Sequence, residues 1–238
     1  EAGLRSFNRR MPEEHNRVLT DHAADLLLAP TTTAMDHLAA EGLSDRSVLV
    51  GDVMTDVLYS TLATNKDGGR GGPNGVTRGE YFVATIHRPD NTDTKERLAS
   101  IIGGLSALDH PVLLLVHPRL ANHAKSHGID LAVGSIRPVE PLAYPQLVAA
   151  VEGSAGVITD SGGLQKEAFL LRVPCTTIRT ETEWVETIEL GWNQLVTDEL
   201  DGLANAVRGL VPLPTSATPY GDGHAAERVA KLLTSGPE

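Results

Sequence analysis

The sequence of 238 residues has a single cysteine, Cys175, and fewer basic than acidic side chains. One cysteine excludes a disulfide scaffold and fits a reducing compartment. The 20 Lys and Arg residues against 31 Asp and Glu residues give a formal net charge of −11. Because nucleic-acid binding needs clusters of Lys and Arg that replace counterions, this balance argues against a nucleic-acid partner.

Long apolar segments are missing as well. No apolar run approaches the ~20 residues of a membrane-spanning helix, and the first residues lack the charged, apolar and small-residue regions of a signal peptide. We therefore expect a soluble, cytoplasmic protein with no membrane partner. The hydrophobic content of 41% is enough for a core, and the length allows one large or two modest domains.

Short apolar runs alternate with amphipathic stretches along most of the chain. The pattern predicts strands at 26–29, 48–51, 81–86, 112–116, 156–159, 174–178 and 193–196. It predicts helices at 31–41, 53–63, 93–107, 119–126, 146–151, 163–171, 199–210 and 223–235. Strands that are apolar throughout and separated by helices are typical of parallel sheets covered on both faces. The predicted fold class is therefore α/β.

One stretch interrupts this rhythm. The segment 65–75 is rich in glycine, and so many glycines can neither pack nor hold a helix. We expect a flexible linker or exposed loop at 65–78.

Polar residues directly follow three of the predicted strands. They are His87 with Arg88, the run 117–119 (His-Pro-Arg), and the run 160–163 (Asp-Ser-Gly-Gly). Parallel α/β sheets bind ligands at the carboxyl ends of their strands. These residues are therefore the candidates for a binding site.

The run 160–163 joins a predicted strand to a predicted helix. A helix start offers unpaired amides and a partial positive charge, and two glycines let a diphosphate approach the backbone. The Ser161 hydroxyl can add a donor, and Glu167, about one turn into the helix, can accept the hydroxyls of a ribose. The alternative is an ordinary N-cap, in which Asp160 or Ser161 satisfies the helix and the glycines only allow tight packing.

Six sequence blocks together resemble one family, the bacterial non-hydrolysing UDP-N-acetylglucosamine 2-epimerases. The block 159–168 (T-D-S-G-G-L-Q-K-E-A) is similar to the family signature T-D-S-G-G-x-Q-x-E-A. The other blocks are 1–5 (E-A-G-L-R), 11–17 (M-P-E-E-H-N-R), 85–91 (T-I-H-R-P-D-N), 182–186 (T-E-W-V-E) and 220–223 (Y-G-D-G). Six blocks in the family's order are far more specific than any one of them.

The resemblance implies a GT-B-like fold of two Rossmann-type domains with parallel sheets and the substrate in the cleft between them. Residues 1–64 would be the remainder of the first domain and 79–212 the UDP-binding second domain. The segment 213–238 would pack back toward the first domain. The family's glycine-rich opening loop and its H-G-D-T turn do not occur here. We therefore expect the first domain to be incomplete, and the resemblance implies a homodimer for the complete protein.

The family inverts carbon 2 of the sugar, and the resemblance implies how. UDP leaves first, preorganised donors stabilise the departing diphosphate, and a carboxylate removes the proton from carbon 2. UDP adds back after a proton returns to the other face. Neither a metal nor another cofactor is expected, since the histidines lack ligand spacing and the Gly-Gly turn lacks the dinucleotide pattern.

The resemblance assigns roles to particular residues. It implies catalytic roles for Glu1, Glu13 and His87. It implies substrate contacts for Arg17, Arg88, His117, Ser161, Gly162, Gly163, Glu167, Thr182 and Glu183. Within this set, 161–163 would hold the diphosphate, Glu167 the ribose, and the turn at 182–183 would close the sugar pocket.

Simpler interpretations exist for several of these residues. Glu13 follows Pro12 at what looks like a helix start, where an acidic side chain favours the helix dipole. Arg17, four residues later, could form an ordinary ion pair with Glu13. His87 could be satisfied by nearby backbone, and His117 is as easily structural as functional.

Three other functions compete with the epimerase. A hydrolysing epimerase would release free N-acetylmannosamine. A GT-B glycosyltransferase would need an acceptor and would have no use for Glu1 and Glu13. An inactive UDP-sugar-binding fragment would bind UDP without turnover. Relatives act on UDP-N-acetylglucosamine or on diacetamido uronic acid forms.

Overall fold

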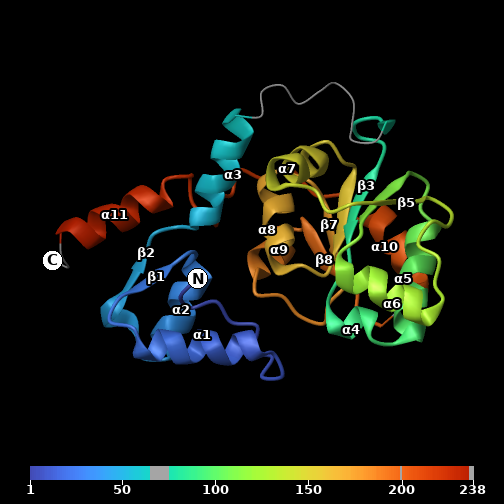
Figure 1. Ribbon diagram of the computed structural model, residues 1–238. Helices are drawn as coiled ribbons and strands as arrows, with labels where there is room; N and C mark the ends of the chain where they lie inside the picture. Colours follow the sequence, from blue (N-terminus) through green and yellow to red (C-terminus); the bar gives the residue numbers. More distant parts are fainter. Residues whose placement is uncertain (65–74, 199, 236–238) are drawn as a thin grey trace. The chain divides into compact units, whose positions relative to one another are not determined.

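The computed structural model describes residues 1–64, 75–198 and 200–235. The chain divides into two compact units (Figure 1). Unit 1 comprises Glu1–Thr64 and Thr215–Glu238, and unit 2 comprises Asn65–Pro214. The predicted linker at 65–78 falls largely on residues outside the described ones.

The described part of unit 2 is built on a parallel sheet with the strand order β5-β4-β3-β6-β7-β8. The strands are β3 (Phe82–Thr85), β4 (Val112–Leu115), β5 (Ile136–Val139), β6 (Gly156–Thr159), β7 (Cys175–Thr177) and β8 (Asn193–Leu195). The helices are α4 (Pro89–Thr92), α5 (Lys95–Ser106), α6 (Pro118–His127), α7 (Tyr144–Glu152), α8 (Gly162–Leu170), α9 (Val185–Glu189), η3 (Leu200–Gly202) and α10 (Leu203–Gly209).

Two apolar clusters cover the two faces of this sheet. Ala84 and Ile158 point into one cluster, where they meet residues of α5, α6 and α10. Their neighbours Val83 and Val157 point into the other, with residues of α7 and α8. Because successive side chains of a strand face opposite ways, a strand covered on both sides is apolar over most of its length, as residues 82–84, 112–115 and 156–158 are. This pattern is why the continuous apolar runs predicted these strands.

The strand β5 is absent from the sequence-based prediction. It lies at one end of the strand order and pairs only with β4 in the described sheet. Its sequence is Ile-Arg-Pro-Val, and Arg137 and Pro138 are exposed. A proline cannot donate to a sheet ladder and is tolerated at sheet edges. An edge strand therefore does not show the apolar pattern on which the prediction relied.

Unit 1 contains a two-stranded parallel sheet in its described residues, β1 (Leu27–Ala29) with β2 (Ser47–Leu49). Its helices are α1 (Pro12–Ala23), α2 (Thr32–Ala40), η1 (Ser44–Arg46), α3 (Val53–Thr64) and α11 (Ala225–Ser235). The Asp56 carboxylate accepts hydrogen bonds from Ala225 N at 3.0 Å and Ala226 N at 2.7 Å. This cap at the start of α11 joins the C-terminal segment to α3 within the same unit.

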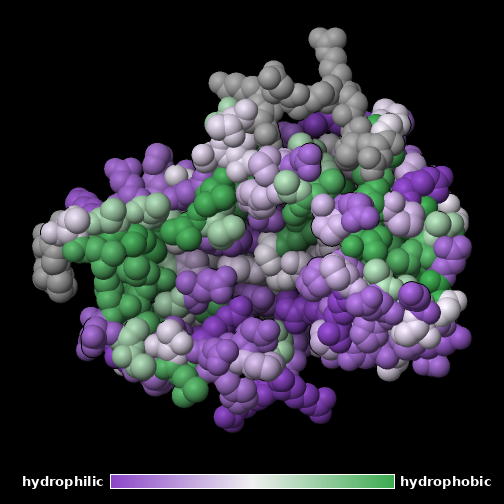
Figure 2. Space-filling view, in the orientation of Figure 1, coloured by the Kyte–Doolittle hydropathy of each residue, from purple (hydrophilic) through white to green (hydrophobic). Residues whose placement is uncertain are grey.

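Buried ion pairs link separate segments of unit 1. The Arg5 guanidinium lies 2.8 Å from a carboxylate oxygen of Asp21 on α1 and 2.8 Å from one of Glu41, the residue after α2. Unit 1 also leaves apolar side chains such as Leu49, Val53 and Leu233 exposed, and green, hydrophobic surface is visible over α11 and β2 in Figure 2. None of the described helices is long and apolar enough to cross a lipid bilayer.

Candidate functional site

Neighbouring strands of the unit 2 sheet end beside one another, and polar residues follow each of them. His117 follows β4, His87 follows β3, Asp160 follows β6 and Arg179 follows β7. These four strands are consecutive in the sheet and parallel. The structure therefore gathers His87, His117 and Asp160, which the sequence indicated as candidates, at one edge of the sheet, together with Arg179, which it did not indicate.

The helix α8 begins immediately after β6. The Ser161 amide donates to Thr159 Oγ1 at 2.9 Å, and Ser161 is the N-cap residue but makes no side-chain capping hydrogen bond. Gly163 is exposed, and a Cβ built there would meet no atom within 4 Å. A helix start exposes amides that lack intrahelical acceptors. The alternative of an ordinary Ser161 cap is thus not what the structure contains.

Gly162 faces a buried ion pair. Arg179 Nη1 lies 2.9 Å from Glu183 Oε2, and both side chains are buried. A Cβ added to Gly162 would lie 2.5 Å from Glu183 Oε1. The neighbouring Thr182 hydroxyl donates to Gln165 Oε1 on α8 at 2.7 Å. The turn at 182–183 is therefore packed against the start of α8, and Gly162 leaves the room that Glu183 occupies.

Glu167 lies on α8 and is largely buried. Its Oε1 accepts a hydrogen bond from the Tyr144 hydroxyl at 3.0 Å. Tyr144 is the first residue of α7, so one helix orients a carboxylate on the other. The sequence analysis did not identify Tyr144, because the contact joins residues 23 positions apart.

Asp160 is fully buried and anchors the loop after β3. Its carboxylate accepts hydrogen bonds from His87 N at 2.9 Å, Arg88 N at 2.8 Å and Asn91 Nδ2 at 3.1 Å. The His87 ring also meets Asp160, with Nδ1 3.2 Å from Oδ1. Asp160 therefore holds the candidate residues His87 and Arg88 in place rather than capping α8. The sequence analysis placed Asp160 among the strand-end candidates and considered it as a cap, but did not predict this anchoring role.

His117 lies next to His87. Their ring centroids are 5.5 Å apart with the planes inclined by 42°. His117 is also the N-cap of α6, where its Nδ1 accepts from Arg119 N at 3.1 Å. The structure thus gives His117 a local structural contact and a place beside a candidate catalytic residue at the same time.

The remaining candidates lie in unit 1. Arg17 Nη2 is 3.6 Å from Glu1 Oε2, and both residues line a pocket of about 400 Å³ between the start of the chain, α1 and β1. Glu13 is exposed on α1. Its neighbour Glu14 is buried instead and accepts from Ser6 N, Ser6 Oγ and Phe7 N at 2.9–3.0 Å. Burial alone would raise the pKa of Glu14, but these hydrogen bonds and the charge of Arg17 lower it overall.

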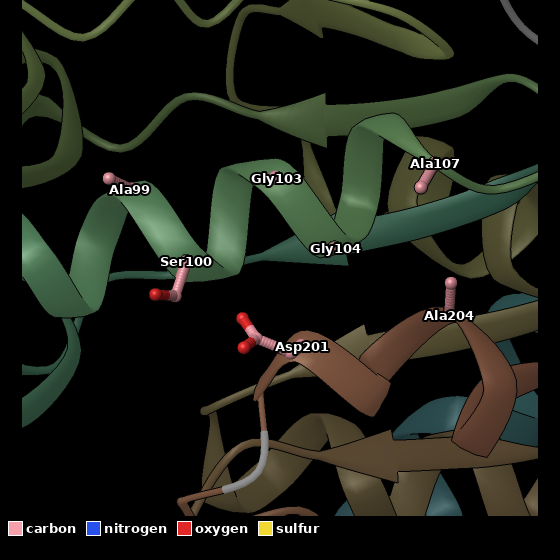
Figure 3. A pocket seen from close by; sticks show the side chains of 7 residues that line it. All are labelled: Ala99, Ser100, Gly103, Gly104, Ala107, Asp201 and Ala204. Atoms are coloured by element: carbon pink, nitrogen blue, oxygen red, sulfur yellow. The ribbon is translucent and has the colours of Figure 1, made fainter.

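Unit 2 has a pocket of its own, of about 460 Å³. It is formed by α5, η3 and α10 and not by the loops at the strand ends (Figure 3). Its lining residues are Ala99, Ser100, Gly103, Gly104, Ala107, Asp201 and Ala204. None of these is a candidate from the sequence, and Asp201 is the one charged residue among them. Elsewhere in the described ranges, no three His, Cys, Asp or Glu side chains are grouped as metal ligands would be.

Comparison with known proteins agrees with this parallel α/β architecture. The profile of a family described as UDP-N-acetylglucosamine 2-epimerase matches residues 1–234. The UDP-N-acetylglucosamine 2-epimerase of Methanocaldococcus jannaschii is 38% identical over 248 residues, covering 99% of this chain and 68% of the relative. The UDP-2,3-diacetamido-2,3-dideoxy-D-glucuronate 2-epimerase of Pseudomonas aeruginosa is 39% identical over 244 residues, covering 98% and 66%.

A solved structure gives the same result. The Methanocaldococcus jannaschii UDP-GlcNAc 2-epimerase, crystallised in complex with UDP-GlcNAc and UDP, superposes with a TM-score of 0.89 at 35% identity. The match covers 99% of this chain and 68% of that one. The chain therefore belongs to the UDP-N-acetylglucosamine 2-epimerase family, whose members are isomerases. The predicted family and the predicted α/β class with GT-B-type relatives are confirmed, and the chain spans about two thirds of the length of these relatives.

Proposed function

We propose that unit 2 binds the UDP part of a UDP-2-acetamido sugar and that the chain serves epimerisation at carbon 2 of that sugar. The observation that carries the proposal is the start of α8, where Ser161 makes no side-chain cap and Gly163 has open space beside it. Amides at such a start, with the positive end of the helix dipole, attract a diphosphate. The relative crystallised with UDP-GlcNAc and UDP supports this choice of ligand.

The remaining residues of the strand ends take roles that their surroundings suit. Glu167, oriented by Tyr144, would accept the ribose hydroxyls. His87, Arg88 and His117 would face the diphosphate, and the turn with Thr182 and Glu183 would border the sugar. In each role a donor would meet an acceptor of the substrate, or a carboxylate would meet its hydroxyl groups.

Epimerisation needs UDP to leave and return. When the bond between carbon 1 and the diphosphate oxygen breaks, its electron pair goes to the diphosphate, and helix amides placed in advance stabilise that charge. A carboxylate takes the proton from carbon 2, and a proton delivered to the other face precedes the return of UDP. Glu1 and Glu13 of unit 1 are the proposed acid and base groups. Arg17 lies 3.6 Å from Glu1 and is its proposed charge partner.

Other functions are less well supported. The names of the relatives do not favour the hydrolysing alternative. The Pseudomonas aeruginosa relative is named for a diacetamido glucuronate substrate, and the Methanocaldococcus jannaschii relative for UDP-N-acetylglucosamine. We propose UDP-N-acetylglucosamine as the first substrate to test. The homodimer and the cytoplasmic location expected from the sequence stay predictions. Sedimentation of the purified chain would check whether it forms a dimer.

The proposal is tested by comparing two glycine substitutions. A Cβ at Gly163 and a Cβ at Gly103, within α5, would each meet no protein atom within 4 Å. Both replacements by alanine should leave the fold intact and favour the helix slightly. Only the methyl group at 163 would stand between the helix start and a diphosphate. We expect Gly163→Ala to weaken UDP binding on the order of tenfold, as measured by calorimetric titration.

The control defines what would refute the proposal. Gly103→Ala should bind UDP as the unsubstituted chain does. Equal UDP affinity of Gly163→Ala and the unsubstituted chain would remove the diphosphate from the start of α8. Absence of UDP binding to the folded, unsubstituted chain would remove the nucleotide-sugar function altogether. Incubation with UDP-N-acetylglucosamine in deuterated buffer then asks whether deuterium enters carbon 2.

A further inference from the structure

Asp160 stands out among the buried side chains because donors surround its carboxylate. His87 N, Arg88 N and Asn91 Nδ2 all donate to it, at 2.8–3.1 Å. Each of these groups is a nitrogen that carries hydrogen and cannot accept. The side chain is fully buried, and its second oxygen accepts as well, since His87 N also lies 3.1 Å from Oδ1.

The ring of His87 meets the same carboxylate. His87 Nδ1 lies 3.2 Å from Asp160 Oδ1, with the His87 side chain 37% exposed and that of Asp160 0% exposed. At this distance a bare Nδ1 would set its lone pair against the lone pairs of the carboxylate oxygen, so the arrangement favours a hydrogen on Nδ1. In the neutral imidazole the second nitrogen, Nε2, is then free of hydrogen. In the protonated imidazole Nε2 carries one, and the carboxylate balances the charge.

The neighbouring ring has the opposite arrangement. His117 Nδ1 accepts from Arg119 N at 3.1 Å, so in the neutral ring the hydrogen is on Nε2. The two ring centroids are 5.5 Å apart. The tautomer of His87 therefore decides whether this pair of neutral rings offers one donor and one acceptor at Nε2, or two donors.

We propose that Asp160 is a positioning residue that fixes the His87 imidazole with its hydrogen on Nδ1 and so makes Nε2 the ring atom that meets the ligand. The backbone bonds to His87 and Arg88 hold the loop while the ring contact sets the tautomer. The use of Nε2 rests on the proposed function: in the protonated ring Nε2 carries a hydrogen that can be donated to the departing diphosphate, while the Asp160 carboxylate balances the charge. The tautomer of the neutral ring does not rest on it.

The tautomer is measured directly on the ligand-free chain. Long-range proton–nitrogen NMR correlations separate ring nitrogens that carry hydrogen from those that do not, and loss of one signal set in His87→Gln assigns His87. We expect the neutral ring to carry its hydrogen on Nδ1. A neutral ring with its hydrogen on Nε2 and a bare Nδ1 would overturn the proposal, and this measurement needs no substitution at Asp160.

Asp160→Asn gives a stronger test. Three N–H donors lie 2.8–3.1 Å from Oδ2, whereas His87 N alone donates to Oδ1, at 3.1 Å. The amide oxygen should therefore occupy the site of Oδ2, and the amide NH₂ the site of Oδ1, facing the ring. A donor there requires a bare Nδ1, so the His87 tautomer should reverse. Asp93→Asn is the matched control, because Asp93 is exposed and pairs with Arg119 and His123 instead of His87. An unchanged His87 tautomer in folded Asp160→Asn would contradict the proposal.

UDP titration separates the two claims. A diphosphate oxygen only accepts, so Nε2 can meet it as a donor in the protonated ring, whose charge the Asp160 carboxylate balances. Asp160→Asn removes that balancing charge and His87→Gln removes the ring, so each should weaken UDP binding about tenfold. The double variant should lose little more, because both act through one ring. Fully additive losses would show that Asp160 does not act through His87. Failure of the unsubstituted chain to bind UDP would count against the proposed function and leave the tautomer measurement to decide on Asp160.

Discussion

Both units bury charged side chains, but they place them differently. In unit 1, Arg5 pairs with Asp21 and Glu41 and thereby joins the first residues of the chain to α1 and to the end of α2. In unit 2, Asp160, Glu167 and the Arg179–Glu183 pair all lie at the ends of β6 and β7 or on α8. The rest of that sheet is packed between two apolar clusters.

The two units differ in what their buried charges contact. In the described part of unit 1 the ion pairs of Arg5 join separate segments, beside buried apolar side chains such as Leu27 and Leu38. A sheet covered on both faces is stable through apolar burial. Its polar residues are then available to arrange a site at the strand ends. The same residue types thus stabilise one unit and organise a candidate site in the other.

The largest effect should follow from removing Arg5. Arg5→Met would leave the Asp21 and Glu41 carboxylates without their shared partner, and breaking a buried pair costs about 3–5 kcal/mol. Hydrogen exchange should show the loss in peptides of unit 1. The control is Arg208→Met, which removes an exposed pair with Asp109 in unit 2 and should change little, because water solvates both groups. Similar losses for both substitutions would contradict the contrast between the units.

Acid should weaken unit 1 by a smaller amount. Hydrogen bonding to Arg5 lowers the pKa of Glu41 against the opposing effect of burial, and the pKa of Glu14 is also lowered. A carboxyl whose pKa is lower in the folded state adds stability at pH values above its unfolded pKa, near the ordinary value of 4.5. That stability is lost as the pH falls through the folded pKa.

Exchange protection in unit 1 should therefore decline below about pH 4.5. Glu14→Gln, which cannot change its charge, should be less stable at neutral pH and lose less on acidification. Protection that rises in unit 1 between pH 5 and pH 3 would show that these carboxylates do not stabilise it.

The sequence predicted those features of the fold and the candidate site that depend on residues close together in the chain. Residues 156–159 and 163–171 were predicted as a strand and a helix, and the structure has Gly156–Thr159 and Gly162–Leu170. Both rest on apolar runs and on the Gly-Gly turn, which are visible within a few residues. The grouping of His87, His117 and Ser161 at one sheet edge was also predictable, because parallel strands align their carboxyl ends.

Contacts between distant segments were not predictable. Asp160 lies 73 positions from His87, so its role as an anchor depends on β3 and β6 being neighbours in the sheet. The same is true of Arg5 and Glu41, 36 positions apart, and of β5, which an edge position allowed to contain Pro138. Signals confined to a few residues predicted individual strands and helices, whereas the partners that orient the candidate residues required the fold.

The smallest effect should come from Tyr144, and it separates site organisation from stability. Tyr144→Phe removes the hydroxyl that donates to Glu167 Oε1 at 3.0 Å, a hydrogen bond worth about 1 kcal/mol. If Glu167 accepts the ribose hydroxyls, losing its orientation should weaken UDP binding roughly fivefold and leave exchange protection of the unit 2 sheet unchanged. The analogue 2′,3′-dideoxy-UDP, which has no ribose hydroxyls, should bind both proteins equally. A fivefold loss with this analogue as well would mean that Tyr144 acts through the fold of α7 and not through Glu167. In that case a buried polar contact would stabilise the fold in unit 2, as the Arg5 ion pairs are expected to do in unit 1.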